Sequence, residues 1–156
     1  MGYTNLETDL RRLAEVMQQS LQENGWNVKL QADSVAAQFG YGTDPTKAPE
    51  AAITTLNPDA AHPATWLTPI YQTGGGLNLL GFSDPKLDEK LDEALAASPA
   101  DAEQLYIDAA EQADQSYYST GIADKNDVIA ARSNITGFTH VPVYIWTVEL
   151  ADLSKE

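Results

Sequence analysis

The sequence predicts an α/β (α+β) domain in which helices cover a mixed sheet. Apolar residues recur at helical spacing near the start of the chain and again in its second half, and short alternating or β-branched runs typical of strands lie between and after them. This mixed order of helices and strands is typical of a covered sheet. With 156 residues, 43% of them hydrophobic, the chain can bury a core, so we predict a single domain spanning residues 1–156.

The first predicted unit is a helix followed by a strand. Five apolar residues recur at three- and four-residue steps along one helical face: Leu6, Leu10, Leu13, Met17 and Leu21. Thr4 with Glu7 fits a capping box, and Gly25 fits the position beyond the last helical turn. Residues 26–30 then alternate between apolar and polar, which predicts a strand with one buried face.

A second strand is predicted at residues 51–56, where a short β-branched run follows a loop rich in Gly, Pro and Thr. The long segment 57–82 that follows carries several prolines and reads as irregular, with room for one or two helical turns at residues 64–71. Such long loops in a compact domain are usually functional, so we expect the ligand here.

Two helices and two strands complete the prediction. Ser83 or Asp84 caps the first of these helices, with Pro85 near its start, and the pair Ser98-Pro99 opens the second. The second helix carries apolar residues around much of its surface, which predicts a well-buried helix. Residues 127–132 and 141–150 read as strands, and residues 133–137 as the turn between them.

Charge and composition exclude several classes of function. The chain has 23 Asp and Glu residues against 9 Lys and Arg residues, a net charge of −14, so nucleic acid and anionic membrane surfaces are disfavoured as partners. The absence of cysteine excludes disulfides, thiolate metal sites and a cysteine nucleophile. No stretch approaches the length of a membrane span, and we interpret Met1 as an artificial or internal start.

Asp59 and His62 are the residues that most resemble a reactive pair. They lie three residues apart in the irregular segment and could act as an acid and a base or as metal ligands. The other histidine, His140, is distant in sequence, so a third ligand is missing and we predict no metal site and no cofactor. We favour a surface or loop-structuring role for His62. The run Gly74–Gly76 lacks the pattern of a phosphate loop and reads as a flexible connection.

The three tryptophans are candidates for a ligand platform. Trp26 and Trp146 fall in predicted strands and are expected in the core, whereas Trp66 lies in the irregular segment and could face a cleft.

Three stretches taken in order resemble the large solute-binding proteins for peptides and nickel that serve ABC importers (family 5 of the solute-binding proteins). They are residues 57–67 (NPDAAHPATWL), 78–82 (NLLGF) and 83–91 (SDPKLDEKL). In that family a strand ends in an Asp-x-x-x-Pro loop, an Asn and an aromatic residue follow, and a proline-led motif opens a helix. Residues 101–106 are similar to a later helix of the family without its arginine, and residues 127–138 resemble its closing strand and turn.

The resemblance covers nearly the whole chain and implies a periplasmic-binding-protein-like lobe, the carboxy-terminal lobe of a longer two-lobed protein. By position it implies that Leu56, Asn57 and Asp59 face the ligand, with Asp59 holding the amino terminus of a peptide through a charge-assisted hydrogen bond. Trp66 and Asn78 complete the predicted ligand-binding set. No catalytic residue is predicted.

This sequence departs from the family pattern at three positions. Leu56 stands where an aromatic residue is common, Ile53 where some peptide binders have a basic residue, and Gly121 where a proline is usual. Sugars, nickel complexes and other small solutes therefore remain open beside peptides.

The resemblance implies a binding protein and not an enzyme. Its expected partners are a small solute such as a peptide, the amino-terminal lobe of the same protein and an ABC permease. The expected location is the periplasm or the extracellular face of the membrane, with a lipid anchor on the full-length protein. Two alternatives remain open: a hydrolase-like domain using Asp59 and His62, and an interaction domain with no small ligand. One lobe alone is expected to bind too weakly for detection at micromolar ligand.

Overall fold

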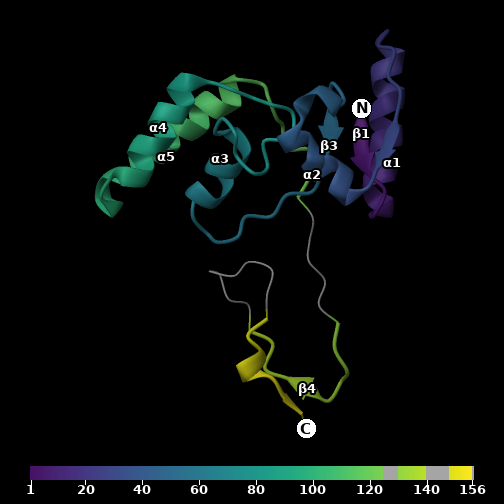
Figure 1. The fold of residues 1–156 in the computed structure, drawn as a ribbon. Coiled ribbons are helices and arrows are strands. Elements are labelled where there is room, and N and C mark those ends of the chain that lie inside the picture. Colours follow the sequence, from purple (N-terminus) through teal and green to yellow (C-terminus); the bar gives the residue numbers. More distant parts are fainter. Residues whose placement is uncertain (125–129, 140–147, 156) are drawn as a thin grey trace.

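A computed structural model describes residues 1–124, 130–139 and 148–155 and confirms the predicted α/β class (Figure 1). Its strands are β1 (Gly2–Thr4), β2 (Gln31–Asp33), β3 (Ala52–Ile53), β4 (Ile135–Thr136) and β5 (Ser154–Lys155). Its α-helices are α1 (Thr8–Glu23), α2 (Val35–Thr43), α3 (Ala64–Tyr71), α4 (Pro85–Ala96) and α5 (Pro99–Gln115). Two short 3-10 helices lie at Pro45–Lys47 and Leu150–Asp152. Figure 1 shows α3, α4 and α5 grouped on one side and α1 with β1 on the other.

The main sheet has three parallel strands in the order β2-β1-β3. The central strand β1 pairs with both neighbours, and Tyr3 lies opposite Ala32 of β2 and Ile53 of β3. Helix α1 connects β1 to β2, and α2 connects β2 to β3 across the central strand. Parallel strands need such crossover connections, which place helices against the sheet.

The two helices cover opposite faces of this sheet. Tyr3 and Ile53 point to one face and pack with Leu10 and Ala14 of α1 into a buried cluster, which we call the sheet cluster. Successive side chains of a strand alternate between faces, so Gln31, which neighbours Ala32, points to the other face. There its side-chain amide donates to the hydroxyl of Tyr41 on α2, at 3.1 Å.

Helices α3, α4 and α5 form a second, larger apolar core, which we call the helical cluster. It contains nine buried residues: Leu67, Ile70, Tyr71, Leu87, Leu91, Ala94, Tyr106, Ala109 and Ala113. Leu87 and Leu91 are the largest fully buried side chains among the described residues. The apolar residues of α4 and α5 recur at helical spacing, and this periodicity brings the two helices together along one face each.

The predicted first helix is confirmed, although its predicted cap is wrong. Thr4 ends strand β1, and Glu7 occupies the position before the first helical residue. The end of the helix follows the prediction: Gly25 has a φ of 86°, its amide donates to the Gln22 carbonyl, and the amide of Trp26 donates to the Leu21 carbonyl. These two bonds form a Schellman motif, which glycine favours because its φ is positive.

The predicted strand at residues 26–30 is wrong. Strand β2 begins at Gln31, whose amide donates to the Met1 carbonyl, because pairing with β1 decides where the strand begins. Trp26, expected in the core, is 67% exposed. The strand predicted at 51–56 is confirmed in part, since only Ala52–Ile53 pairs. Strand β1 and helix α2 were not predicted.

The helices predicted in the second half are confirmed. Helix α3 fills residues 64–71, and Asp84 caps α4 by accepting from the amides of Lys86 and Leu87. The prediction that the last helix is well buried is wrong. Only Tyr106, Ala109 and Ala113 of α5 are buried, because the helix packs through a single face; Ala102 and Leu105 beside that face are half-buried, and most other side chains are exposed.

The strands predicted at 127–132 and 141–150 lie largely outside the described residues, as do His140 and Trp146. The described part of the first, residues 130–132, is not a strand, and Leu150 begins a 3-10 helix. The predicted turn at 133–137 contains β4, which pairs antiparallel with β5 in a separate two-stranded sheet.

Candidate functional site

A hollow of about 190 Å³ lies at the carboxyl ends of the parallel strands. Thr4 ends β1, Thr54, Thr55 and Leu56 follow β3, and Val35 opens the helix after β2. Leu56 and Leu77 also pack against the helical cluster, so the hollow lies where the sheet meets that cluster. Its full lining is Thr4, Leu6, Glu7, Val35, Gln38, Phe39, Thr54, Thr55, Leu56, Leu77 and Leu79.

The strand order explains why a hollow opens at this place. From the central strand β1 the chain passes to β2 on one side of it, and from β2 it crosses over to β3 on the other side. The strand order therefore reverses between β1 and β3. In open α/β sheets ligands bind in the crevice outside the carboxyl ends of the strands at such a switch point. Thr4 and Thr54 stand at this point on the two diverging strands.

The lining of the hollow is mainly apolar. Six of its residues have aliphatic or aromatic side chains, and among them Leu6 is 75% and Phe39 51% exposed. The polar groups are threonine hydroxyls and one glutamine, and the single ionisable side chain is Glu7. Pockets with apolar walls and a few polar groups are suited to organic ligands. This lining favours an uncharged apolar group and disfavours an anion.

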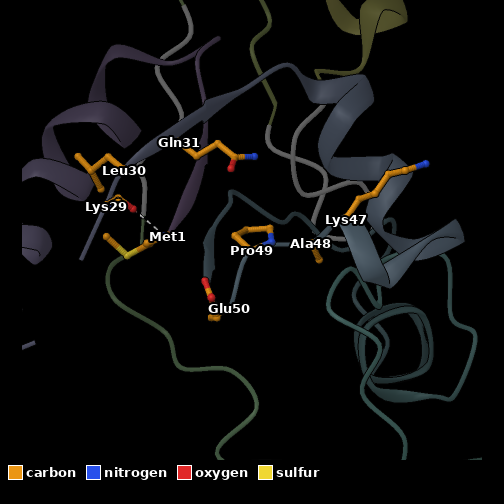
Figure 2. A pocket seen from close by; sticks show the side chains of 8 residues that line it. All are labelled: Met1, Lys29, Leu30, Gln31, Lys47, Ala48, Pro49 and Glu50. Carbon is orange, nitrogen blue, oxygen red and sulfur yellow. Dashed lines mark hydrogen bonds between the residues drawn. The ribbon is translucent and has the colours of Figure 1, made fainter. Parts of the chain in front are cut away.

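A second hollow, of about 540 Å³, lies at the opposite ends of the same strands (Figure 2). Residues that precede each strand line it: Met1, Lys29, Leu30, Gln31, Lys47, Ala48, Pro49 and Glu50. The amino group of Met1 donates to the carbonyl of Lys29 at 2.8 Å, as drawn in Figure 2. Although it is larger, this hollow lies at the amino ends of the strands, where the switch-point geometry does not operate, so we regard the smaller hollow as the candidate site.

The structure separates the five residues predicted to bind ligand. Leu56 lines the hollow at the strand ends. Asn57 and Asp59 follow it directly in sequence and are exposed. Trp66 lies on α3 and is 37% exposed, and it is not part of the described lining of the hollow.

Asn78 is 3% exposed, and its side chain is occupied by the protein itself. Its amide nitrogen donates to the carbonyls of Gln72 and Phe82, at 3.1 and 2.7 Å. Its amide oxygen accepts from the Phe82 amide and the Tyr118 hydroxyl, at 2.8 and 3.0 Å. Both donors and both acceptor positions of an asparagine are then used. Asn78 therefore fixes the loop between α3 and α4, and its neighbours Leu77 and Leu79 are the residues that reach the hollow.

His62 has structural contacts of its own. Its Nδ1 accepts a hydrogen bond from the Ala64 amide at 3.2 Å, at the start of α3. Its ring meets the ring of Tyr106 edge to face, with 5.3 Å between centroids. Among the residues that the structure describes, no group of three or more His, Cys, Asp or Glu side chains could hold a metal ion.

The triple glycine, predicted as a flexible connection, is closely packed at its centre. A Cβ atom on Gly75 would lie 2.5 Å from the Pro69 carbonyl oxygen of α3, so no larger residue fits without a shift of the backbone. The Leu77 amide also donates to that carbonyl, at 2.9 Å. The loop is therefore held against α3, which brings Leu77 to the hollow.

Asp33 is a buried carboxylate at the carboxyl end of β2, 6% exposed. Its Oδ1 accepts from the Gln31 side chain at 2.8 Å, whereas its Oδ2 has no hydrogen-bond partner among the described residues. Burial raises the pKa of the neighbouring Tyr41, and the Asp33 carboxylate raises it further. The second face of the sheet is thus polar as well as buried.

Sequence reasoning missed most of the residues that line the hollow. Leu6 was assigned to the helical stripe, and Val35, Phe39, Leu77 and Leu79 were not considered as site residues. For Leu6 and Val35 the available signal was their position, since apolar residues just after parallel strands belong to the edge where ligands bind.

Comparison with known proteins supports the fold. No protein-family model and no curated protein matches the sequence. Among solved structures the chain is similar to AppA from Clostridium difficile, named a peptide binding protein, with a TM-score of 0.79 and 17% identity over 99% of this chain and 33% of that one. It is also similar to the clavulanic acid biosynthesis oligopeptide binding protein 2, with a TM-score of 0.61 and 21% identity over 73% of this chain and 23% of that one.

These similarities confirm the periplasmic-binding-protein-like fold that the sequence resemblance implied. The chain spans about a third of the length of AppA and about a quarter of the second protein.

Proposed function

We propose that this chain is the ligand-binding lobe of a solute-binding protein that delivers a small solute, in the first place a peptide, to an ABC importer. The observation that carries the proposal is the hollow at the switch point of the sheet, in a chain whose fold matches that of AppA along 99% of its length. A site at this edge of one lobe is open to solvent and can be closed by a second lobe, as in hinge-type binding proteins.

Binding is favoured over catalysis by the contacts of the suspected reactive pair. His62 is engaged by the Ala64 amide and by the ring of Tyr106, which is the loop-structuring role expected for it. Both neighbouring structures are named as binding proteins. The hydrolase alternative and the interaction-domain alternative gain no comparable support.

The chemistry of the hollow favours a peptide with an apolar side chain and a free amino terminus. An aliphatic or aromatic group would be buried against Leu56, Leu77 and Leu79. Threonine hydroxyls at the strand ends can bond to main-chain groups of the ligand. Asp59, exposed and three residues beyond Leu56, can approach an ammonium group, and the net charge of −14 attracts cations in general.

The proposed partners follow from the share of the known structures that the chain covers. The remaining part of a longer protein would supply the second lobe, and an ABC permease would receive the solute. The proposed location is the extracellular face of the membrane or the periplasm, with a lipid anchor on the full-length protein. Among the described residues no helix is both long enough and apolar enough to span a bilayer.

The proposal is tested by a thermal-shift screen of the two-lobed protein against dipeptides, oligopeptides, oligosaccharides and nickel chelates. A ligand that binds the native state raises the melting temperature by mass action. We expect a shift with peptides that carry an apolar side chain, reduced by Leu56→Asp and by Asp59→Asn but not by the control Asp108→Asn on α5. A shift with sugars or chelates alone would replace the peptide as the solute, and no shift with any class would reject the receptor function.

A further inference from the structure

One wall of the hollow is formed by a tight turn that contains no residue of regular structure. Leu77 and Leu79 line the hollow, and Asn78 between them points away from it into the protein. The Leu79 amide donates to the Leu77 carbonyl at 2.9 Å, which closes the turn. The position of both leucines therefore depends on what holds Asn78.

Tyr118, from a distant part of the chain, holds this turn at two places. Its hydroxyl donates to the Asn78 side-chain oxygen at 3.0 Å and accepts from the Leu80 amide at 3.2 Å. The bonded residues lie 40 and 38 positions away in sequence. One hydroxyl thus fixes residues on both sides of Leu79.

The ring of Tyr118 is itself fixed by aromatic packing. It lies 4.7 Å from the ring of Phe82 and 6.0 Å from that of Tyr71, measured between centroids. Tyr71 also bonds through its hydroxyl to Ser119, the residue after Tyr118. The segment that leaves α5 is therefore anchored to α3 and to the loop after it.

We propose that Tyr118 is a positioning residue of the ligand site, which acts through Asn78 and Leu80 to place the Leu77–Leu79 wall although it does not itself line the hollow. The inference rests on the proposed function. It also gives the buried Asn78, predicted as a ligand contact, a different role in the same site. Movement of the segment after α5 would be transmitted to the hollow through this hydroxyl.

The protonation of Tyr118 suits this role. Burial raises the pKa of its hydroxyl, and the hydrogen bond from the Leu80 amide opposes that rise in part. The hydroxyl therefore keeps its proton at neutral pH and remains a donor to Asn78.

The test compares Tyr118→Phe with Tyr106→Phe in the 156-residue chain. Both changes remove one hydroxyl from a tyrosine packed in the helical cluster, and Tyr106 is remote from the turn in its described contacts, which include His62. Both variants keep the ring and are expected to fold, as circular dichroism would verify. The first readout is the NMR signals of the Leu77 and Leu79 methyl groups without ligand. We expect them to shift or broaden in Tyr118→Phe and to stay unchanged in Tyr106→Phe.

The second readout is the affinity for the tripeptide Ala-Leu-Ala at millimolar concentration. We expect Tyr118→Phe, which removes both hydrogen bonds of the hydroxyl, to weaken it by about three- to ten-fold, with no change in Tyr106→Phe. If the methyl signals of Leu77 and Leu79 are the same in Tyr118→Phe and Tyr106→Phe, the positioning role of Tyr118 is overturned, whatever the measured affinities. If the unaltered chain binds no peptide at millimolar concentration, binding is measured in the two-lobed protein, where its absence would reject the proposed function. The methyl signals still decide whether Tyr118 places the wall.

Discussion

Two buried polar residues, Asn78 beside the helical cluster and Asp33 on the sheet, differ in how many of their hydrogen-bonding positions are filled. Next to the helical cluster, Asn78 is buried with all four of its hydrogen-bonding positions filled. On the sheet, Asp33 is buried, and one of its carboxylate oxygens has no hydrogen-bond partner in the part of the chain that the structure describes. The helical cluster is also the larger apolar core: among the described residues it has nine buried members, and the sheet cluster has four.

The difference indicates that the helices supply most of the stability, whereas the proposed binding site lies at the edge of the sheet. The larger apolar core and the fully hydrogen-bonded Asn78 make the helices the more rigid support. The sheet has strands of two or three residues, and exposed apolar side chains gather at its carboxyl edge, where the hollow lies. Ligand sites are often formed by less stable elements next to a stable scaffold.

The largest effect is expected from truncating the helical cluster. Leu91 is 1% exposed, and Leu91→Ala should cost about 3–5 kcal/mol of unfolding free energy, through lost apolar burial and the cavity left behind. Leu10→Ala in the sheet cluster should cost roughly 2–3 kcal/mol, because Leu10 is 8% exposed and its site can relax. Urea unfolding followed by circular dichroism measures both. A larger loss for Leu10→Ala would reverse the comparison.

Asn78→Ala should be the next largest change. It leaves the Phe82 amide and the carbonyls of Gln72 and Phe82 without their partner, at a cost of about 2–3 kcal/mol. The control Asn57→Ala removes an exposed asparagine in the preceding loop and should change stability by less than about 0.5 kcal/mol. Equal losses in the two variants would show that the four bonds of Asn78 do not hold the loop.

Asp33→Asn should increase stability by about 1 kcal/mol. The change removes the charge of a buried carboxylate whose Oδ2 has no hydrogen-bond partner among the described residues, and the remaining oxygen can still accept from Gln31. Asp9→Asn on the exposed surface of α1 is the matched control and should have little effect. A loss of stability in Asp33→Asn would mean that the carboxylate has a favourable partner, and the sheet would then be as well satisfied as the helices.

Alkaline pH should have the smallest effect and should act on both regions. The pKa of Tyr41 and that of Tyr118 are raised in the folded chain, mainly by burial, above the ordinary value of 10.0. Folding therefore favours the protonated hydroxyls. Their stabilisation is complete below pH 10.0 and is lost as the pH rises through the folded-state pKa values. The free energy of unfolding, measured from neutral pH to pH values above the folded-state pKa of both tyrosines, should show this loss. The loss should be smaller in Tyr118→Phe. If the unfolding free energy of Tyr118→Phe falls with rising pH as steeply as that of the unaltered chain, burial of the Tyr118 hydroxyl does not contribute to the loss.

The helices were predictable because their signals are local. The stripe from Leu6 to Leu21, the Asp84 cap and the glycine at position 25 are short-range signals, and the structure has all three except for Leu6, which precedes α1 and is exposed. The strands were less predictable because their pairing is not local. Strand β1 has three residues, and β2 begins where Gln31 meets β1 and not where the alternation at 26–30 suggested.

The candidate site was predictable only in part for the same reason. Leu56 was predicted from its position in the resemblance to the solute-binding family, and it lines the hollow. Phe39 and Leu79 reach the hollow from segments far from Leu56 in sequence, and no local pattern marks them. The role of Asn78 depends on Tyr118, 40 residues away, which no motif at either position reveals.

The most direct test of the account is a titration of the ¹⁵N-labelled chain with Ala-Leu-Ala, followed by two-dimensional NMR at up to millimolar peptide. We predict weak binding, with amide shifts concentrated at Thr4, Thr54 and Thr55, at the carboxyl ends of the strands. The same peptide with an acetylated amino terminus should bind more weakly, because Asp59 then has no ammonium group to approach. Shifts confined to the opposite hollow around Lys29 and Glu50, or no shifts at all, would contradict it.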